Sequence, residues 1–218
     1  MDLSAGNIVI GVVLFILIIL LIRWLMGSAN KLTGLNDAKK VTKIDATSLA
    51  QNNASNYAYS VWFYIDDWSY RYGEPKIILG RLDKDLNPSP SIVLGAIENN
   101  LKIETTVYPS SQSTDSSTHT CNVDNVPVQK WVNVIASLYG RTMDVYIDGK
   151  LVRTCVLPGV AKIANNAPVY VTPMGGFSGY TSNIKYFANS LNPQEAYNLY
   201  REGFGGPSME FPYQVKIE

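Results

Sequence analysis

The chain has 218 residues, of which 18 are basic, 18 are acidic and only 17% carry a charge. A chain without net charge lacks the basic surface that nucleic-acid binding needs, so nucleic acid is excluded as a main partner. Residues 27–218 follow an apolar N-terminal segment and are enough for one domain with a substantial core.

The N-terminal segment is apolar without interruption from residue 8 to residue 22 and continues to Met26. Residues 8–26 would form roughly 28 Å of helix, close to the hydrocarbon thickness of a bilayer. We therefore predict a tail at residues 1–7 and a transmembrane helix at Ile8–Met26. The predicted anchor residues are Ile8, Leu14, Phe15, Leu21, Arg23 and Trp24. The alternative is a cleaved signal peptide, but its expected basic start is missing.

The flanks of this segment predict an orientation. Basic residues follow it and none precedes it, so the positive-inside rule places the C-terminal domain on the cytoplasmic face of a single-pass membrane protein. Residues 27–40 are polar and contain no aromatic side chain, which is typical of a tether. The glycosylation sequon at Asn53 would then be hidden from the glycosylation machinery.

Alternating apolar residues predict a series of short strands after the tether. The expected strands are Val41–Asp45, Tyr57–Ile65, Lys76–Gly80, Ser91–Ile97, Leu101–Val107, Trp131–Tyr139, 142–148, Lys150–Val156, Val169–Val171 and Ser182–Phe187. Asp148-Gly149 is a strong hairpin signal, and residues 110–120 are expected to form an exposed loop.

One short helix is expected near the C-terminus. Asn192 is its N-cap, Pro193 occupies its first position, Glu195 completes a capping box and Gly203 lies at its end. About ten short strands and one helix predict an all-β, two-sheet antiparallel jelly-roll sandwich over residues 41–205, with a tail at 206–218.

Three segments carry a resemblance to a known family. They are Ser60-Val61-Trp62-Phe63-Tyr64, the run from Trp131 through Tyr146-Ile147-Asp148-Gly149-Lys150-Leu151-Val152, and Phe177 to Tyr186 with the closing helix. The chain resembles the laminin-G-like branch of the concanavalin A-like jelly rolls. On a single membrane anchor, such a domain is similar to minor capsid or membrane proteins of large double-stranded DNA viruses.

The viral resemblance implies a non-enzymatic minor capsid protein that links the internal virion membrane to the capsid shell. Its partners would be the lipid bilayer and other capsid or membrane proteins, with the domain facing the capsid. The alternative is a surface-displayed lectin that binds glycans. Glycosylation at Asn53 or a disulfide between the two cysteines would favour the lectin, because both require export from the cytosol.

Catalytic motifs are weak, so we predict that the chain is not an enzyme. A retaining glycosidase needs two carboxylates about 5–5.5 Å apart, and Asp144 and Asp148 lack an acid between them. Glu98 and Glu104 flank a turn and are expected at solvated edges. His119 is the only histidine, which argues against a zinc site or a hydrolytic triad.

Three further residue sets are candidates for binding. Asp83, Asp85 and Asn87 place oxygen atoms at alternate positions, as a calcium loop does. Trp68, Tyr70 and Tyr72 could stack on a sugar or anchor a partner, or simply cover the edge of the sandwich. Cys121 and Cys155 could form a disulfide, or remain reduced if the domain faces the cytosol.

Overall fold

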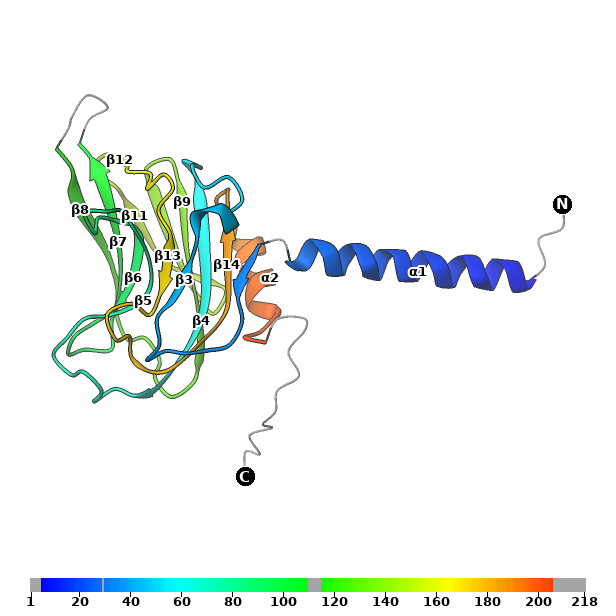
Figure 1. Ribbon diagram of the computed structural model, residues 1–218, viewed down its shortest axis with the longest axis horizontal. Helices are drawn as coiled ribbons and strands as arrows, with labels where there is room; N and C mark the ends of the chain where they lie inside the picture. Colours follow the sequence, from blue (N-terminus) through cyan, green and yellow to red (C-terminus); the bar gives the residue numbers. More distant parts are fainter. Residues whose placement is uncertain (1–4, 29, 110–114, 206–218) are drawn as a thin grey trace.

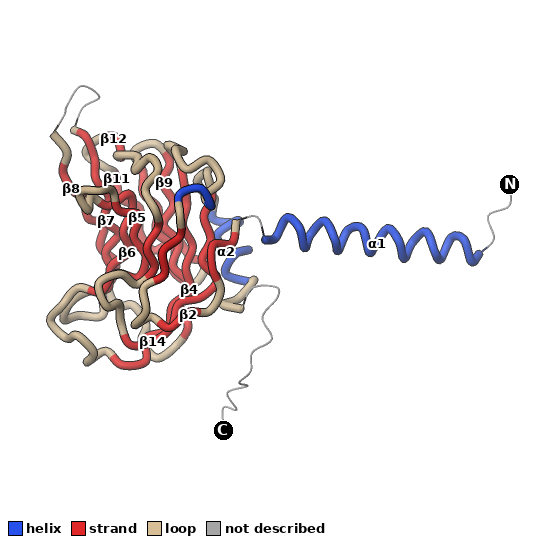
Figure 2. The backbone as a smooth tube through the Cα atoms, viewed as in Figure 1, coloured by secondary structure: helices blue, strands red, loops and turns tan. Residues whose placement is uncertain are grey.

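The protein consists of a β-sandwich and one projecting helix in this computed structural model, which describes residues 5–28, 30–109 and 115–205. Helix α1 (Ala5–Ser28) extends away from the sandwich, and the short helix α2 (Pro193–Arg201) lies against one sheet (Figure 1). Figure 2 shows the strands gathered into one body, with loops at both ends. The predicted tails at residues 1–7 and 206–218 lie largely or wholly outside the described residues.

Two antiparallel sheets, each of seven strands, form the sandwich. Sheet A has the order β1-β14-β4-β9-β10-β11, with β2 also paired to β14; its strands are β1 (Lys31–Thr33), β2 (Asn36–Asp37), β4 (Tyr57–Asp67), β9 (Trp131–Tyr139), β10 (Thr142–Ile147), β11 (Lys150–Val156) and β14 (Ser178–Phe187). Sheet B has the order β12-β7-β6-β5-β13-β3, with β8 also paired to β7; its strands are β3 (Thr42–Ile44), β5 (Lys76–Leu82), β6 (Pro88–Leu94), β7 (Leu101–Tyr108), β8 (Ser117–Val123), β12 (Val160–Ala161) and β13 (Val169–Val171).

The core forms between the sheets from residues that alternate along each strand. Phe63 of β4 and Val134 of β9 are fully buried in it, as is Ile92 from β6 of the opposite sheet. A period of two sends every second side chain to the same face, so a single alternating strand supplies a whole row of the core. The sandwich predicted from alternation is therefore confirmed.

The β10–β11 hairpin and helix α2 follow the sequence closely. Asp148 and Gly149 both have positive φ at the hairpin turn, as a primed turn requires. The Asn192 side chain accepts a hydrogen bond from the Glu195 amide while the Glu195 carboxylate accepts one from the Asn192 amide, which completes the predicted capping box. Buried Ala196 and Leu199 fasten α2 to sheet A through Ile135 and Tyr146.

The structure corrects two predicted segments. The expected polar tether at 27–40 is not a free linker, because β1 and β2 both pair with β14 and join sheet A. Strands of two or three residues are too short to show an alternating pattern, so periodicity could not predict them. The expected loop at 110–120 ends earlier, because β8 begins at Ser117 and pairs along β7.

The prediction of a membrane span at Ile8–Met26 is not supported. A helix does form there. Among the described residues, however, no helix combines the length and the apolar character needed to cross a membrane.

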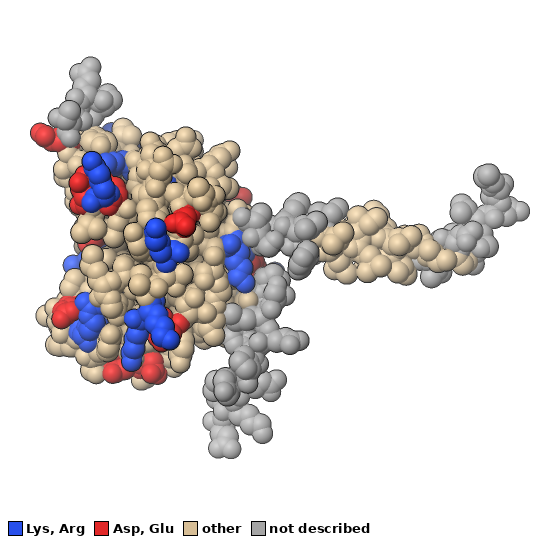
Figure 3. Space-filling model, in the orientation of Figure 1, with Lys and Arg blue, Asp and Glu red and all other residues tan. Residues whose placement is uncertain are grey.

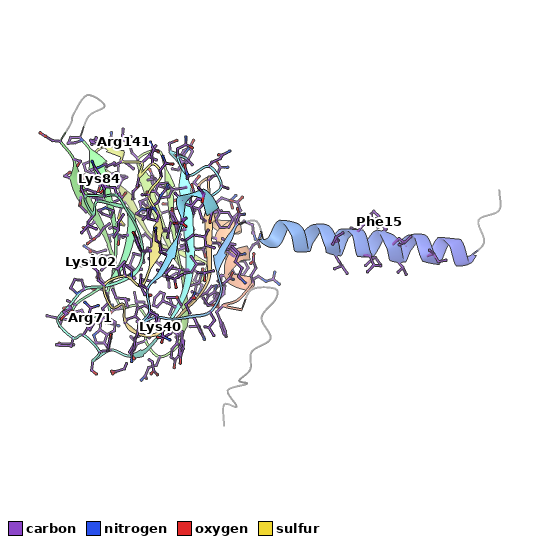
Figure 4. All side chains as sticks on the ribbon, in the orientation of Figure 1. Phe15, Lys40, Arg71, Lys84, Lys102 and Arg141 are labelled. Carbon is purple, nitrogen blue, oxygen red and sulfur yellow. A yellow bond between two sulfur atoms is a disulfide. The ribbon has the colours of Figure 1, made fainter. Side chains whose placement is uncertain are left out.

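Helix α1 leaves its apolar side chains uncovered. The large apolar residues from Ile10 to Leu21 are 41–63% exposed, and Phe15, labelled in Figure 4, is the most exposed of them. Figure 3 shows basic and acidic side chains interspersed over the sandwich, whereas the described surface of α1 carries neither. Among the predicted anchor residues, Leu14, Phe15 and Leu21 lie in this exposed stretch, and the side chains of Ile8, Arg23 and Trp24 fall outside the described ones.

Candidate functional site

A row of aromatic rings covers the outer face of sheet A next to α2. Trp62 stacks on Tyr200 with ring centroids 5.6 Å apart, and Trp131 stacks on Phe204 at 4.6 Å. Trp62 is almost fully buried by this packing, although it points away from the sandwich core. The row therefore holds Tyr200 in one orientation and fixes α2 on the sheet.

A groove of about 790 Å³ opens at the end of this row. Its walls are the loop after β8, the β10–β11 hairpin with the start of β11, and one face of α2. The residues that line it are Asn122, Val123, Asp124, Asn125, Val126, Pro127, Ile147, Asp148, Lys150, Val152, Arg153, Tyr197 and Tyr200. We call this site the α2 groove.

Two tyrosines form one wall of the α2 groove. Tyr197 and Tyr200 are three positions apart on α2, so they lie on the same side of the helix. Tyr197 is 46% exposed, and its ring centroid lies 6.3 Å from that of Tyr200. One ring is thus fixed by Trp62, and the next is open to a ligand.

The hairpin tip sets the width of the groove. Gly149 has φ +74°, and a Cβ built there would lie 3.0 Å from the Tyr200 Cβ and 3.1 Å from the Tyr197 Cα. Only glycine allows the hairpin to approach α2 this closely. The DG turn therefore does more than reverse the chain, because it also brings the polar hairpin residues to the two tyrosines.

The polar side chains of the groove are largely free to bind a ligand. Within the described parts of the chain, the side chains of Asp124, Asn125, Lys150 and Arg153 have no hydrogen bond or ion pair. Asp148 differs, because its carboxylate accepts a hydrogen bond from the Asn133 backbone amide at 2.9 Å and another from Lys130 Nζ at 3.1 Å. The groove therefore offers an amide, a carboxylate and two cations beside an exposed aromatic ring.

This combination suits a polyhydroxylated ligand. A sugar ring presents C–H groups on its faces, which pack on an aromatic ring, and hydroxyls around its edge, which need donors and acceptors. Tyrosine supplies both a flat apolar surface and a polar tip.

A second groove, of about 720 Å³, lies between the β5–β6 loop and residues 162–174. Two of its four charged side chains pair with each other, because Lys162 Nζ lies 2.7 Å from the Asp83 carboxylate, whereas Lys84 and Asp85 have no described ion pair. Its wall contains one tyrosine, Tyr170, and several apolar residues. The α2 groove is thus the better candidate for polar recognition.

Two of the three predicted calcium residues, Asp83 and Asp85, also line the second groove. Asp83 accepts hydrogen bonds from the amides of Asp85 and Asn87, from Asn87 Nδ2 and from Lys162. Partial burial raises the pKa of the Asp83 carboxyl, but the bonds from Lys162 and Asn87 outweigh it, so the pKa lies well below its usual value. The Asp83 carboxylate is thus paired with an ammonium group, and no cluster of three or more His, Cys, Asp or Glu side chains that could hold a metal occurs among the described residues. Calcium binding at Asp83, Asp85 and Asn87 stays a prediction.

The three side chains of the predicted aromatic set Trp68, Tyr70 and Tyr72 differ in their contacts. Trp68 Nε1 donates a hydrogen bond to the Ile97 carbonyl at 3.0 Å, and its ring covers the Lys76 ammonium group at 5.0 Å. Tyr70 donates a hydrogen bond to the Gly175 carbonyl, and only Tyr72, at 60%, is largely exposed. Two of the three side chains therefore join their loop to neighbouring segments, and a binding role for the set stays a prediction.

Trp68 encloses a buried lysine that the sequence did not reveal. Lys76 is only 2% exposed, and its ammonium group has no hydrogen-bond partner among the described residues. Burial lowers the pKa of Lys76, and nearby Arg71 lowers it further. The cation–π contact with Trp68 offsets part of the cost of this burial.

The acidic residues considered for catalysis are kept apart. Glu104 pairs with Ser91 and Thr120 in the β-ladders, and Glu98 precedes β7, so the two do not face each other. Burial raises the pKa of Glu104, with Lys102 acting in the opposite direction. Asp144 accepts a hydrogen bond from Thr154 at 2.6 Å. His119 lies on β8 opposite Thr105, and not in a loop.

A disulfide joins Cys121 of β8 to Cys155 of β11, with Cα atoms 6.0 Å apart. It links the two sheets directly behind the α2 groove, because β8 leads into the groove loop and β11 forms part of its wall. The cross-link therefore holds two of the three groove walls in a fixed relation.

The sequence pointed to aromatic residues other than those of the α2 groove for a simple reason. Tyr197 and Tyr200 belong to an amphipathic helix, where an exposed tyrosine does not by itself indicate a binding site, and the groove residues of the β8 loop and the β10–β11 hairpin are 44 or more positions earlier. The available signals were the three-residue spacing of the tyrosines and the Asp148-Gly149 turn. Neither signal shows that helix α2 and the hairpin lie against each other.

Comparison with known structures bears out the sandwich. The receptor-binding domain of botulinum neurotoxin D is similar with a TM-score of 0.60 and 13% identity, covering 80% of this chain and 46% of that one. A botulinum neurotoxin DC binding domain in complex with SialylT (TM-score 0.57, 15% identity) and one in complex with rat synaptotagmin II (0.56, 17%) each cover 74% of this chain and 39% of the other. The chain thus spans less than half of these structures, and at such identities the likeness shows the fold alone.

A search of curated proteins gives no match. A family model matches residues 37–196, which include both sheets almost completely and the start of α2. On this match the chain belongs to the concanavalin A-like lectin/glucanases superfamily, as a laminin-G-type domain.

Proposed function

We propose that the domain is a non-enzymatic carbohydrate-binding module and that the α2 groove is its binding site. The observation that carries the proposal is the exposed Tyr197 ring beside polar side chains that have no other described partner. Membership of the concanavalin A-like lectin/glucanases superfamily supports the carbohydrate-binding part of the proposal. The complex of a similar domain with SialylT also fits, although that chain is more than twice as long as the part that matches.

The proposed location is an oxidising compartment or an outer surface, where glycans are displayed. The Cys121–Cys155 disulfide supports this, because such bonds form outside the reducing cytosol. The Asn53 sequon is exposed and thus accessible to the glycosylation machinery. Both features argue against the cytoplasmic face that the charge distribution predicted.

The role of a minor capsid protein that links a virion membrane to a shell stays a prediction. It depended on the viral resemblance and on a membrane anchor, and no described contact favours it over the lectin.

A glycan array tests the proposal. The full chain is solubilised in mild detergent and applied beside its Tyr197→Ala and Tyr72→Ala variants. Tyr197→Ala removes the open ring of the groove, so we expect it to weaken binding by roughly tenfold to a hundredfold, which corresponds to about 1.4–2.7 kcal/mol of lost binding free energy.

Tyr72→Ala is the matched control, since Tyr72 is also exposed but lies outside the groove. It should bind like the unaltered chain. Absence of any specific glycan signal would overturn the proposal, and equal loss in both variants would move the site away from the α2 groove.

A further inference from the structure

A short turn before β4 contains the only N-glycosylation sequon of the chain, Asn53-Ala54-Ser55. Asn87-Pro88-Ser89 has the same spacing, but the proline at its middle position excludes it. The Ala54 amide donates a hydrogen bond to the Gln51 carbonyl at 3.0 Å, so Asn53 occupies the third position of a β-turn. The Gln51 carbonyl also accepts a hydrogen bond from the Tyr186 hydroxyl at 3.1 Å, which fastens the turn to the sandwich.

Asn53 differs from the asparagines on either side of it. Asn52 Nδ2 donates a hydrogen bond to the Ala46 carbonyl at 3.3 Å, and Asn56 Oδ1 accepts one from the backbone amide of the β9–β10 turn at 2.8 Å. Asn53 and Ser55 are exposed, and within the described chain their side chains have no hydrogen bond. The amide that would be modified and the hydroxyl of its sequon are therefore both accessible.

A groove of about 430 Å³ lies beside this turn, within the range of small-ligand sites of roughly 300–1,000 Å³. Ser55 lines it and is two residues from Asn53, so at most about 7 Å of backbone separates Asn53 from the groove. Two apolar side chains of the groove are uncovered, because Tyr139 is 68% and Val160 54% exposed. We call this site the Tyr139 groove.

The Tyr139 groove and the α2 groove lie at opposite ends of strand β9. Trp131 begins β9 directly after the loop that lines the α2 groove, and Tyr139 ends it, which places the two about 27 Å apart along the strand. Arg141, which lines the Tyr139 groove, is labelled at the top of the sandwich in Figure 4, and Arg71 at the bottom. A glycan attached at Asn53 therefore leaves the α2 groove open.

We propose that Asn53 carries an N-linked glycan whose first N-acetylglucosamine residues lie in the Tyr139 groove. In the attachment step Asn53 Nδ2 bonds to C1 of a lipid-diphosphate-linked oligosaccharide, the bond from C1 to the diphosphate oxygen breaks, and Nδ2 loses one proton. The apolar face of a sugar ring packs on Tyr139 and covers apolar surface that is otherwise open to water. The proposal rests on the oxidising compartment proposed above and does not depend on what the α2 groove binds.

Expression of the full chain in mammalian cells tests the attachment. We expect an N-glycan-releasing amidase to lower the mass of the unaltered chain and of Ser55→Thr, which keeps the sequon, but not of Asn53→Gln or Ser55→Ala. Peptide mapping should find aspartate at position 53 after the release.

Thiol alkylation of the same samples reports the compartment through the Cys121–Cys155 disulfide. A chain with this disulfide but without a glycan would overturn the glycosylation and leave the proposed compartment standing. Free thiols together with an unmodified Asn53 would overturn both.

The melting temperature tests where the sugars lie. Releasing the glycan from the folded protein should lower the melting temperature of the unaltered chain by at least about 2 °C, and that of Tyr139→Ala by less than about half as much. Tyr72→Ala is the matched control, since Tyr72 is equally open but lies next to Arg71 at the other end of the sandwich, and it should respond like the unaltered chain. Equal shifts in all three chains would overturn the placement over Tyr139.

Discussion

A pattern of single residues shows which groups are near in the sequence, but not which distant groups they contact. Oxygen side chains at 83, 85 and 87 predict a calcium loop, and the Asp83 carboxylate forms an ion pair with Lys162, which is 79 positions later. Calcium binding by this loop stays a prediction. Trp68 is a second case, because its ring covers the Lys76 ammonium group.

The Asp83–Lys162 pair predicts a pH dependence of stability. The pKa of Asp83 is lower in the folded chain than in the unfolded chain, where it is about 3.9. The contribution of Asp83 to the free energy of unfolding is therefore complete above about pH 3.9 and is lost as the pH falls through the pKa of the folded chain. We expect Asp83→Asn to lower the free energy of unfolding at pH 7 and the difference from the unaltered chain to shrink below about pH 4. Urea unfolding at several pH values measures this.

Asp85→Asn is the control within the same loop, since the Asp85 carboxylate has no described ion pair. It should leave the stability at pH 7 nearly unchanged. A difference for Asp83→Asn that stays constant down to pH 2 would show that the ion pair contributes nothing.

Elements with a strong local signal were predictable and short elements were not. Helix α2 was readable because its capping box is a matter of four neighbouring residues. The hairpin at Asp148-Gly149 was predictable because few residue pairs adopt positive φ at both positions of a turn, and Asp-Gly is one of them. Strands β1 and β2 were missed because their pairing with β14 depends on residues about 140–150 positions later.

Gly149→Ala tests whether the hairpin is fitted to α2. The added Cβ would have both a positive φ and contacts of 3.0–3.2 Å with Tyr197 and Tyr200. Gly140→Ala has a positive φ but no atom within 4 Å of the new Cβ. We expect Gly140→Ala to cost about 1 kcal/mol and Gly149→Ala at least about twice as much, measured by chemical denaturation.

Glycan binding gives a second readout of the same pair. Gly149→Ala should weaken it, because displacing α2 moves the two tyrosines, whereas Gly140→Ala should not. Equal effects of the two variants on stability and binding would mean that the close approach of the hairpin and α2 has no consequence.

At the scale of the whole molecule, the alternation of apolar residues predicted the sandwich, and the segment from Trp131 to Val152 predicted the family. The fold and the family model confirm both. The site was not predictable, because the α2 groove is built from a loop, a hairpin and a helix that meet only in the folded chain. The role of α1 could not be read from its composition alone.

The arrangement in Figure 1 predicts that the sandwich folds without α1, which projects away from it. Removing residues 1–28 should leave the melting temperature within about 2 °C, since none of the described side chains of α1 belongs to the buried core. It should also reduce self-association in water, because exposed apolar surface of this extent drives association. A large drop in melting temperature, seen by circular dichroism, would show that α1 supports the domain.

Glycan recognition by the α2 groove is tested most directly by nuclear magnetic resonance of the ring signals of the tyrosines. The labelled chain is titrated with the glycan that binds best on the array, and single substitutions assign Tyr197, Tyr200 and Tyr72. The account predicts that the signals of Tyr197 and Tyr200 shift together and saturate, while Tyr72 stays in place. Shifts confined to Tyr72 and its loop, with Tyr197 unmoved, would contradict it.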